Sequence, residues 1–438
     1  MSALAVACLL FAAVPAPASA ASARVLTLEE ALHLARERQP SLRQARAGTE
    51  AAQARADEFR APLLPQVFAS LGYSRTTANV IYRPGPTASV SPTTGSTASD
   101  FATYNSFSGA LTLNQLIYDF GQTSGRWHAQ EAQANAVADS ERATVLQALL
   151  NVRGSYFDAR ANKALAGVAR ETLDNLRKHQ SQIEEFVKAG TRPEIDLVQA
   201  RTDTANAVVT VINAENAYES SKAQLNQAMG SPGPTDYDVA DEQLSAVQGE
   251  DAAVDALLDE SLRVRPEVAS LLAQLNAQQE VLRSVEGQYG PSIGANAGIS
   301  QGGTALDHLN WNASAGVSLS WGLFQGGLTN ATVREARSSE AALRAQLDGL
   351  RLQIRLEVEQ VRLAVRATKA ALGASREALL NSRERLNLAE QRYQQGLGSI
   401  IELGDAQVAV TSASAQVVQA DFRLATARAQ LLKALGRP

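Results

Sequence analysis

The side chains best suited to metal binding or acid–base catalysis are few in this 438-residue sequence. The histidines show no metal-ligand spacing; they are His33, His128, His179 and His308. The sequence has no G-x-S-x-G, P-loop or H-E-x-x-H motif. Gly396 and Gly398 lack the third glycine of a nucleotide-binding fingerprint and do not follow a predicted strand. We therefore expect neither a catalytic site nor a cofactor, and a protein that is not an enzyme.

The sequence contains a single cysteine, Cys8. It lies in an N-terminal apolar run that ends in Ala-Ser-Ala, a pattern typical of a signal peptide over residues 1–20. The mature chain would then begin at Ala21 and contain neither a disulfide nor a thiolate metal site. A lipid anchor at Cys8 is the alternative, but "LAVAC" has alanine where such signals prefer leucine.

Charge and hydropathy exclude two further classes of protein. The formal net charge is -5 and the pI is near 5.6, so a basic surface for nucleic acid is not indicated. No segment beyond the signal peptide approaches the ~20 uninterrupted apolar residues of a transmembrane helix. If the protein spans a membrane, strands must do it.

The mature sequence contains an internal duplication. Pro40 and Pro65 are 25 residues apart, and the same spacing recurs 226 residues later at Pro266 and Pro291. Five further pairs share an offset of 206 residues: Tyr118 and Phe324, Gly121 and Gly327, Gly190 and Gly396, Gly230 and Gly436, Pro232 and Pro438. One offset over five pairs predicts two copies of a single structural unit.

The two copies divide the mature chain into residues 21–239 and 240–438. The first copy is longer by the difference between the offsets, 20 residues. The surplus coincides with "NVIYRPGPTASVSPTTGSTASD" (79–100), whose Ser, Thr, Pro and Gly are typical of an exposed loop. We expect a long polar loop at about 77–105 and a shorter one at about 301–310.

In two segments of each copy, side chains of different character alternate along the chain, as they do in β-strands. The predicted strands cover about 66–76 and 106–119 in the first copy and about 292–301 and 311–324 in the second. All three tryptophans lie in or beside these segments. Strands of this length fit a membrane barrel, and an aromatic belt at the membrane interface would explain the clustering. The alternative is a soluble antiparallel sheet with aromatic core residues.

A proline-free helical segment follows each strand pair, at 121–189 and 327–395. At ~1.5 Å per residue, each helix would reach roughly 100 Å, which is too long for a globular core. After a short break, a stripe with steps of three and four runs from Leu403 to Leu431, and a weaker version runs from Leu197 to Leu225. The stripes predict long helical hairpins packed through coiled-coil seams. Further apolar residues beside each seam favour helices with two neighbours, as in the wall of a helical tube.

Glycine-containing turns separate the helices of each predicted hairpin, at about 190–193 and 396–399. Glycine releases the backbone at the end of a helix. Pro193 is suited to the first turn of the next helix. These turns would form the end of each hairpin that lies farthest from the strands.

Taken together, these features resemble the TolC family of outer-membrane efflux and secretion ducts. The most specific segments are "LTLEEALHLARERQPSLRQA" (26–45), "FQGGLTNATVREA" (324–336) and "RYQQGLGSIIELGDAQ" (392–407). The resemblance implies a homotrimer in which each chain contributes four strands to one twelve-stranded membrane β-barrel. A periplasmic α-helical barrel of coiled-coil helices would continue this β-barrel and narrow at the hairpin turns.

The resemblance also implies a function and partners. The protein would be an outer-membrane duct of a tripartite efflux pump or a type I secretion system. It would act as a passive exit channel that docks to a periplasmic adaptor and an inner-membrane transporter, with its strands in outer membrane lipid. The alternative is a soluble periplasmic coiled-coil structural or adaptor protein, which would explain the helices but not the paired strands. The sequence does not select among drugs, metal ions and secreted proteins as cargo.

Gate and docking residues follow from the resemblance, position by position. Asp196, Glu402 and Asp405 stand where family members place gate carboxylates, and Tyr393 where they place a gate tyrosine. Gly398 replaces the family's gate arginine, whereas Arg192 holds the equivalent place in the first copy. The turns implied in adaptor docking contain Gly190, Thr191, Arg192, Gly396, Leu397, Gly398 and Ser399. Asp196 and Glu402 could also serve as first-turn carboxylates that the helix dipole favours.

Overall fold

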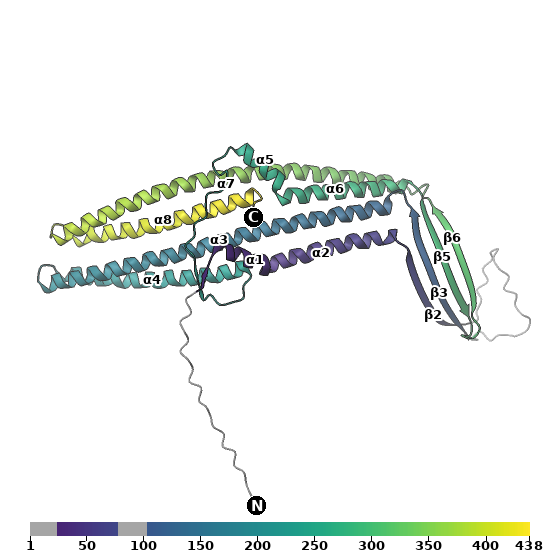
Figure 1. Cartoon of the computed structure of the whole chain (residues 1–438), viewed down its shortest axis with the longest axis horizontal. Helices are drawn as coiled ribbons and strands as arrows, with labels where there is room; N and C mark the ends of the chain where they lie inside the picture. Colours follow the sequence, from purple (N-terminus) through teal and green to yellow (C-terminus); the bar gives the residue numbers. More distant parts are fainter. Residues whose placement is uncertain (1–23, 78–102) are drawn as a thin grey trace, which may run out of the picture. The chain divides into compact units, whose positions relative to one another are not determined.

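A computed structural model describes residues 24–77 and 103–438 (Figure 1). The predicted signal peptide, Cys8 and most of the predicted 77–105 loop lie outside the described residues. The chain forms two compact units. The first contains Met1–Arg43, Thr144–Val264 and Arg355–Pro438; the second contains Gln44–Ala143 and Arg265–Ile354. Each unit therefore draws segments from both predicted copies.

The second unit contains a four-stranded antiparallel sheet with the order β2-β3-β5-β6. Its strands are β2 (Gln66–Thr77), β3 (Thr103–Tyr118), β5 (Ser292–Gly303) and β6 (Asn310–Ser320). They lie in the segments for which alternation predicts strands. The outer edges of β2 and β6 have no partner strand among the described residues.

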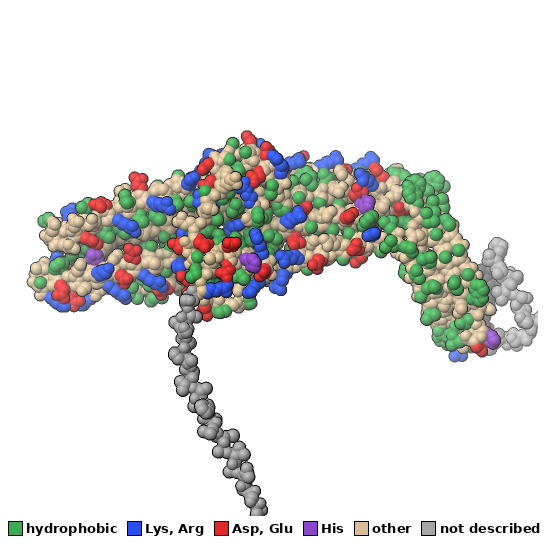
Figure 2. All heavy atoms as spheres, viewed as in Figure 1, with side chains coloured by type: hydrophobic (Ala, Val, Ile, Leu, Met, Phe, Trp, Pro, Cys, Tyr) green, Lys and Arg blue, Asp and Glu red, His purple; other side chains and the backbone are tan. Residues whose placement is uncertain are grey.

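One face of this sheet is apolar and the other is mostly polar. On the apolar face, Leu113 pairs with Val67 on one side and Ala297 on the other. The polar face carries rows such as Asn114 beside Asn296, because successive residues of a strand point to opposite faces. The apolar side chains are exposed in the single chain, and Leu71 reaches 94%. Figure 2 shows that charged side chains gather over the helices and are sparse over the sheet.

The last strand is shorter than the predicted segment 311–324, because β6 ends at Ser320. The chain then turns tightly, with the Leu323 amide donating to the Trp321 carbonyl at 3.1 Å. The Trp321 indole N–H donates to the Tyr289 carbonyl at 3.0 Å. These local bonds take the tryptophan out of the ladder although its apolar character continues the strand pattern.

Helical segments of the second unit lead into and out of the sheet. They belong to α2 (Pro40–Arg60), α3 (Gln122–Lys188), α6 (Pro266–Glu286) and α7 (Leu328–Gln394), with short 3₁₀ turns at Ala61–Leu63 and Gly287–Tyr289. Proline starts both α2 and α6, where its missing N–H costs nothing. α3 and α6 approach closely, since a Cβ on Gly125 would lie 2.9 Å from the Ser284 Cβ.

The first unit contains the predicted hairpins. Its remaining helices are α1 (Leu28–Arg38), α4 (Glu194–Met229), α5 (Val254–Val264) and α8 (Ile400–Ala434). Two short strands, β1 (Arg24–Leu26) and β4 (Tyr237–Val239), pair in parallel. A core that includes Tyr156 and Phe157 of α3 packs α1 and α4 against these strands. The strands β1 and β4 and the helix α5 were not predicted from the sequence.

The predicted heptad stripes are buried seams. On α8, Leu403, Ala406 and Leu431 are almost wholly buried. On α4, Leu197 and Leu225 are buried at equivalent places. The predicted coiled-coil packing of the long helices is thus confirmed. Among the described residues, no helix combines the length and apolarity needed to cross a membrane.

Candidate functional site

The two hairpin turns, at the ends of α3 and α7, have the same backbone hydrogen bonds. After α7, the Leu397 amide donates to the Arg392 carbonyl at 2.9 Å and the Gly396 amide to the Tyr393 carbonyl at 3.1 Å. After α3, Thr191 and Gly190 repeat both bonds. This is the Schellman motif, which needs a left-handed residue after the helix. Glycine meets that need, with φ of 72° at Gly190 and 79° at Gly396.

The start of the second helix differs between the turns. Pro193 is the N-cap of α4, with an extended ψ of 150°, and not a residue of its first turn as predicted. The extended ψ lets its carbonyl accept from the Asp196 amide at 3.2 Å. Ser399 is the N-cap of α8, and its hydroxyl accepts from the Glu402 amide at 3.1 Å. Ser399 therefore has a structural role in helix capping.

Near the turns, one apolar cluster joins all four long helices of the first unit. Its buried members are Ile183, Leu197, Ala200, Ala389, Tyr393, Leu403 and Ala406. The ends of the two hairpins are therefore held together within one chain, and side chains of the two turns can meet.

Arg192 of the first turn contacts Tyr393 of the second hairpin. The guanidinium carbon lies 4.4 Å from the centroid of the tyrosine ring, and one of its nitrogens donates to the Tyr393 carbonyl at 3.1 Å. A guanidinium over an aromatic face is attracted by the ring quadrupole. The arginine of the first copy thus links the two hairpins, whereas a side chain at Gly398 would crowd Tyr393, because a Cβ there would lie 3.1 Å from the tyrosine amide nitrogen.

Tyr393 is 5% exposed, and its hydroxyl has no hydrogen-bond partner among the described residues. Burial raises the pKa of this hydroxyl, and the Asp196 carboxylate adds to the rise although the Arg192 charge opposes it. The phenol is therefore neutral at physiological pH, and its contact with Arg192 is made by the ring.

The three predicted gate carboxylates have different surroundings. Asp196 is only 8% exposed, and its side chain makes no hydrogen bond or ion pair within the described chain. Glu402 is partly buried and pairs with Arg392 at 3.1 Å. Asp405 is exposed. Asp196 and Glu402 also lie in the first turns of α4 and α8, where the helix dipole stabilises negative charge.

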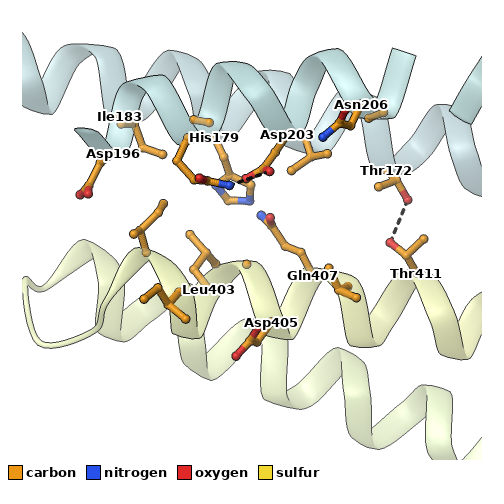
Figure 3. A pocket seen from close by; sticks show the side chains of 18 of the residues that line it. Thr172, His179, Ile183, Asp196, Asp203, Asn206, Leu403, Asp405, Gln407 and Thr411 are labelled. Atoms are coloured by element: carbon orange, nitrogen blue, oxygen red, sulfur yellow. Dashed lines mark hydrogen bonds between the residues drawn. The ribbon is translucent and has the colours of Figure 1, made fainter. Parts of the chain in front are cut away.

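Two further links between the hairpins were not predicted from the sequence. The His179 imidazole of α3 lies 3.3 Å from the Glu390 carboxylate of α7. The hydroxyls of Thr172 on α3 and Thr411 on α8 form a hydrogen bond with an O–O distance of 3.1 Å (Figure 3). These residues lack any shared periodicity that would connect them in advance. Within 24–77 and 103–438, no group of three or more His, Cys, Asp or Glu side chains is placed to hold a metal ion.

The sequence of this chain matches the model of a known protein family. The sequence model of outer membrane efflux proteins covers residues 31–231 and 257–437. The chain belongs to the outer membrane efflux protein family. The resemblance to TolC-type ducts is thereby confirmed. Members of the efflux protein family are outer-membrane channels and not enzymes, which supports an outer-membrane location for this chain.

Individual relatives cover nearly the whole chain. Outer membrane protein TolC of Escherichia coli (strain K12) is 23% identical over 420 residues, which are 91% of this chain and 79% of TolC. Protein CyaE of Bordetella pertussis is 27% identical over 426 residues, which are 96% of this chain and 86% of CyaE. The crystal structure of the outer membrane protein VceC from Vibrio cholerae superposes with a TM-score of 0.79 at 19% identity, covering 94% of this chain and 96% of VceC. The structural likeness shows a shared fold.

Proposed function

We propose that the protein is the outer-membrane duct of a tripartite efflux pump or a type I secretion system. The observation that carries the proposal is the four-stranded sheet, which has one apolar face, one mostly polar face and, among the residues that the structure describes, two unpaired edges. An apolar face suits contact with lipid, and a polar face suits a water-filled lumen. Membership of the efflux protein family supports this assignment.

The unpaired edges support a homotrimer. An edge strand exposes a row of backbone donors and acceptors, and within lipid these groups must be paired. In the proposed trimer, β2 of one copy pairs with β6 of the next, and three copies close a twelve-stranded barrel. Exposed leucines on α7, at Leu352, Leu356 and Leu363, have the spacing of one helix face and offer apolar contact to a neighbouring copy.

The hairpin turns serve two purposes in this proposal. Asp196, Glu402 and Asp405, with Tyr393 and Arg192, form the periplasmic gate. The turns themselves dock to a periplasmic adaptor that connects the duct to an inner-membrane transporter. Exposed Leu397 supports the docking role, because an apolar side chain at the tip of a turn is available to a partner. The helices would then lie in the periplasm.

The proposal is tested with the full chain expressed in a Gram-negative host. We expect a heat-resistant trimer in purified outer membranes, and stepwise conductance when this trimer is added to a planar bilayer. A monomer confined to the periplasmic fraction would overturn the proposal and favour the soluble coiled-coil alternative.

A further inference from the structure

A groove separates α4 from α8 near the hairpin turns, with α3 behind it (Figure 3). All of its lining residues belong to the first compact unit. Its volume is about 930 Å³. Sites for small organic ligands range from roughly 300 to 1,000 Å³, so the groove has room for one such molecule.

The walls of the groove present apolar side chains to solvent. Ile195 on α4 and Ile401 and Val408 on α8 line it, and each is about two-thirds exposed or more. Deeper in the groove, Leu176 and Ile183 of α3 add apolar surface. Covering such surface with an apolar ligand is favourable, at about 25 cal/mol per Å².

The charged groups of the groove have one sign. Asp196, Asp203 and Asp405 contribute carboxylates, and the lining residues include no lysine or arginine. Asp203 accepts a hydrogen bond from the Gln199 amide at 2.9 Å. Figure 3 shows Asp196 and Asp203 on α4 beside the groove, whereas Asp405 points away from α4. The only other titratable side chain of the lining, His179, is paired with Glu390.

Two polar groups of the groove lack partners. Asp196 is more than nine-tenths buried, and its carboxylate makes no hydrogen bond or ion pair within the described residues. The Gln407 side-chain nitrogen is buried and has no acceptor within the same residues. Buried polar groups are usually satisfied, and a carboxylate on a mostly buried residue favours a nearby positive charge. The groove therefore combines apolar walls with carboxylates, and its lining includes no lysine or arginine. The Gln407 N–H group is a donor, so it offers a place for an acceptor atom rather than for a positive charge.

We propose that this groove binds hydrophobic organic cations. The positive centre lies beside Asp196 and Asp203, and the apolar body lies against Ile195, Ile401 and Val408. This proposal rests on the proposed duct function. If the protein is a duct, organic cations are a class of cargo that it would hold close to its gate.

Tetraphenylphosphonium and tetraphenylborate test the proposal, because they share size and shape and differ in the sign of their charge. The purified full-length protein in a non-ionic detergent is titrated with each ion by equilibrium dialysis, and a protein-free micelle blank is subtracted. We expect saturable binding of the phosphonium at one site per chain and no saturable binding of the borate. Equal binding of both ions would overturn the proposal.

Charge-neutralising variants locate the site. Asp203→Asn should weaken phosphonium binding by about threefold to tenfold, and the double change with Asp196→Asn by more. The matched control is Asp174→Asn, which removes the same charge from α3 at a largely exposed side chain that does not line the groove. Circular dichroism and the trimer band on gels confirm folding. Unchanged binding in both groove variants, or an equal loss in the control, would overturn the proposal.

The apolar wall is tested separately. Val408→Ser removes apolar surface without changing charge, so it should weaken phosphonium binding severalfold and leave the preference over the borate intact. The same preparations are added to planar bilayers. Conductance without phosphonium binding overturns only the groove assignment, whereas phosphonium binding without conductance overturns the duct.

Discussion

At the scale of single residues, Tyr393 forms one of the links between the two hairpins. Its ring lies under the Arg192 guanidinium, whereas its hydroxyl has no partner among the described residues. The two parts of the side chain therefore make different predictions for a gate. If the ring forms the link, the hydroxyl is dispensable.

We expect Tyr393→Phe to leave the closed state intact and Arg192→Ala to open it. Phenylalanine keeps the aromatic face, and losing an unpaired buried hydroxyl costs little or is stabilising. Alanine at 192 removes both the stacking and the hydrogen bond to the Tyr393 carbonyl, which together contribute about 1–3 kcal/mol. Single-channel conductance should thus rise for Arg192→Ala alone. An increase for Tyr393→Phe would show that the hydroxyl holds the gate.

At the scale of elements, the sequence was informative where a pattern repeats. The α8 stripe from Leu403 to Leu431 was predictable because a buried coiled-coil seam demands apolar residues at steps of three and four. Both turns were predictable because the Schellman motif requires a left-handed residue, which glycine supplies at Gly190 and Gly396.

Elements that show no repeating pattern of apolar and polar residues could not be predicted from the sequence. β1 and β4 have three residues each, too few to show alternation. The pairing of Arg192 with Tyr393 joins residues 201 positions apart, and no local signal connects them. The same holds for Glu250 and Arg428, which are 178 positions apart and fix the loop between β4 and α5 against α8.

The Glu250 carboxylate has an unusually dense set of partners. It accepts two hydrogen bonds from the Arg428 guanidinium, at 2.9 and 3.0 Å, one from the Val247 amide at 3.0 Å and a longer one from Lys369 at 3.4 Å. Burial alone would raise the pKa of Glu250, but the hydrogen bonds from Arg428 and Val247 outweigh it, so the pKa lies below its ordinary value of 4.5. The native state is therefore stabilised by the ionised carboxylate.

Glu250→Gln should lower the free energy of unfolding by about 3 kcal/mol at pH 7, because Arg428 loses its counter-charge. A depressed pKa contributes stability above the unfolded-state value and loses it as the pH falls through the folded-state value. The difference from wild type should consequently narrow below about pH 4.5. Urea unfolding at pH 7 and pH 4, followed by circular dichroism, measures this change.

Asp251→Asn is the control for that experiment. Its carboxylate is exposed and pairs at 3.1 Å with Lys369, which also lies 3.4 Å from Glu250. Because solvent screens an exposed pair, the loss of Asp251 should cost much less than the loss of the buried Glu250 charge. A gap between wild type and Glu250→Gln that stays constant with pH would contradict the role assigned to the charge.

At the scale of the whole molecule, the exposed apolar face of the sheet distinguishes the proposed membrane protein from the soluble alternative. Alternation within each segment predicts its strands, whereas the partners of the β2 and β6 edges leave no periodic signal in the sequence. Leu71 is the sharpest probe of that face, because its side chain is 94% exposed in the middle of β2.

We expect Leu71→Arg to reduce the heat-resistant trimer in outer membranes, because arginine on a lipid-facing strand costs about 2–4 kcal/mol at the bilayer midplane. Ser70→Arg places the same charge on the mostly polar face, beside Ala110, and should be tolerated. Immunoblots of unheated outer membranes measure both variants. Equal amounts of trimer would show that the Leu71 face is not against lipid.

The docking role of the turns gives the last prediction. Leu397 is 71% exposed at the tip of the second turn. An exposed apolar side chain adds little to folding but can contribute much of the binding energy at an interface. Leu397→Glu should therefore leave trimer assembly and membrane insertion intact but abolish export and cross-linking to the adaptor. Gln395→Glu adds the same charge to the turn without removing apolar surface, and it should export normally. If both variants fail, repulsion by the added charge explains the loss. If the Leu397→Glu trimer exports like wild type, the turn only ends a helix.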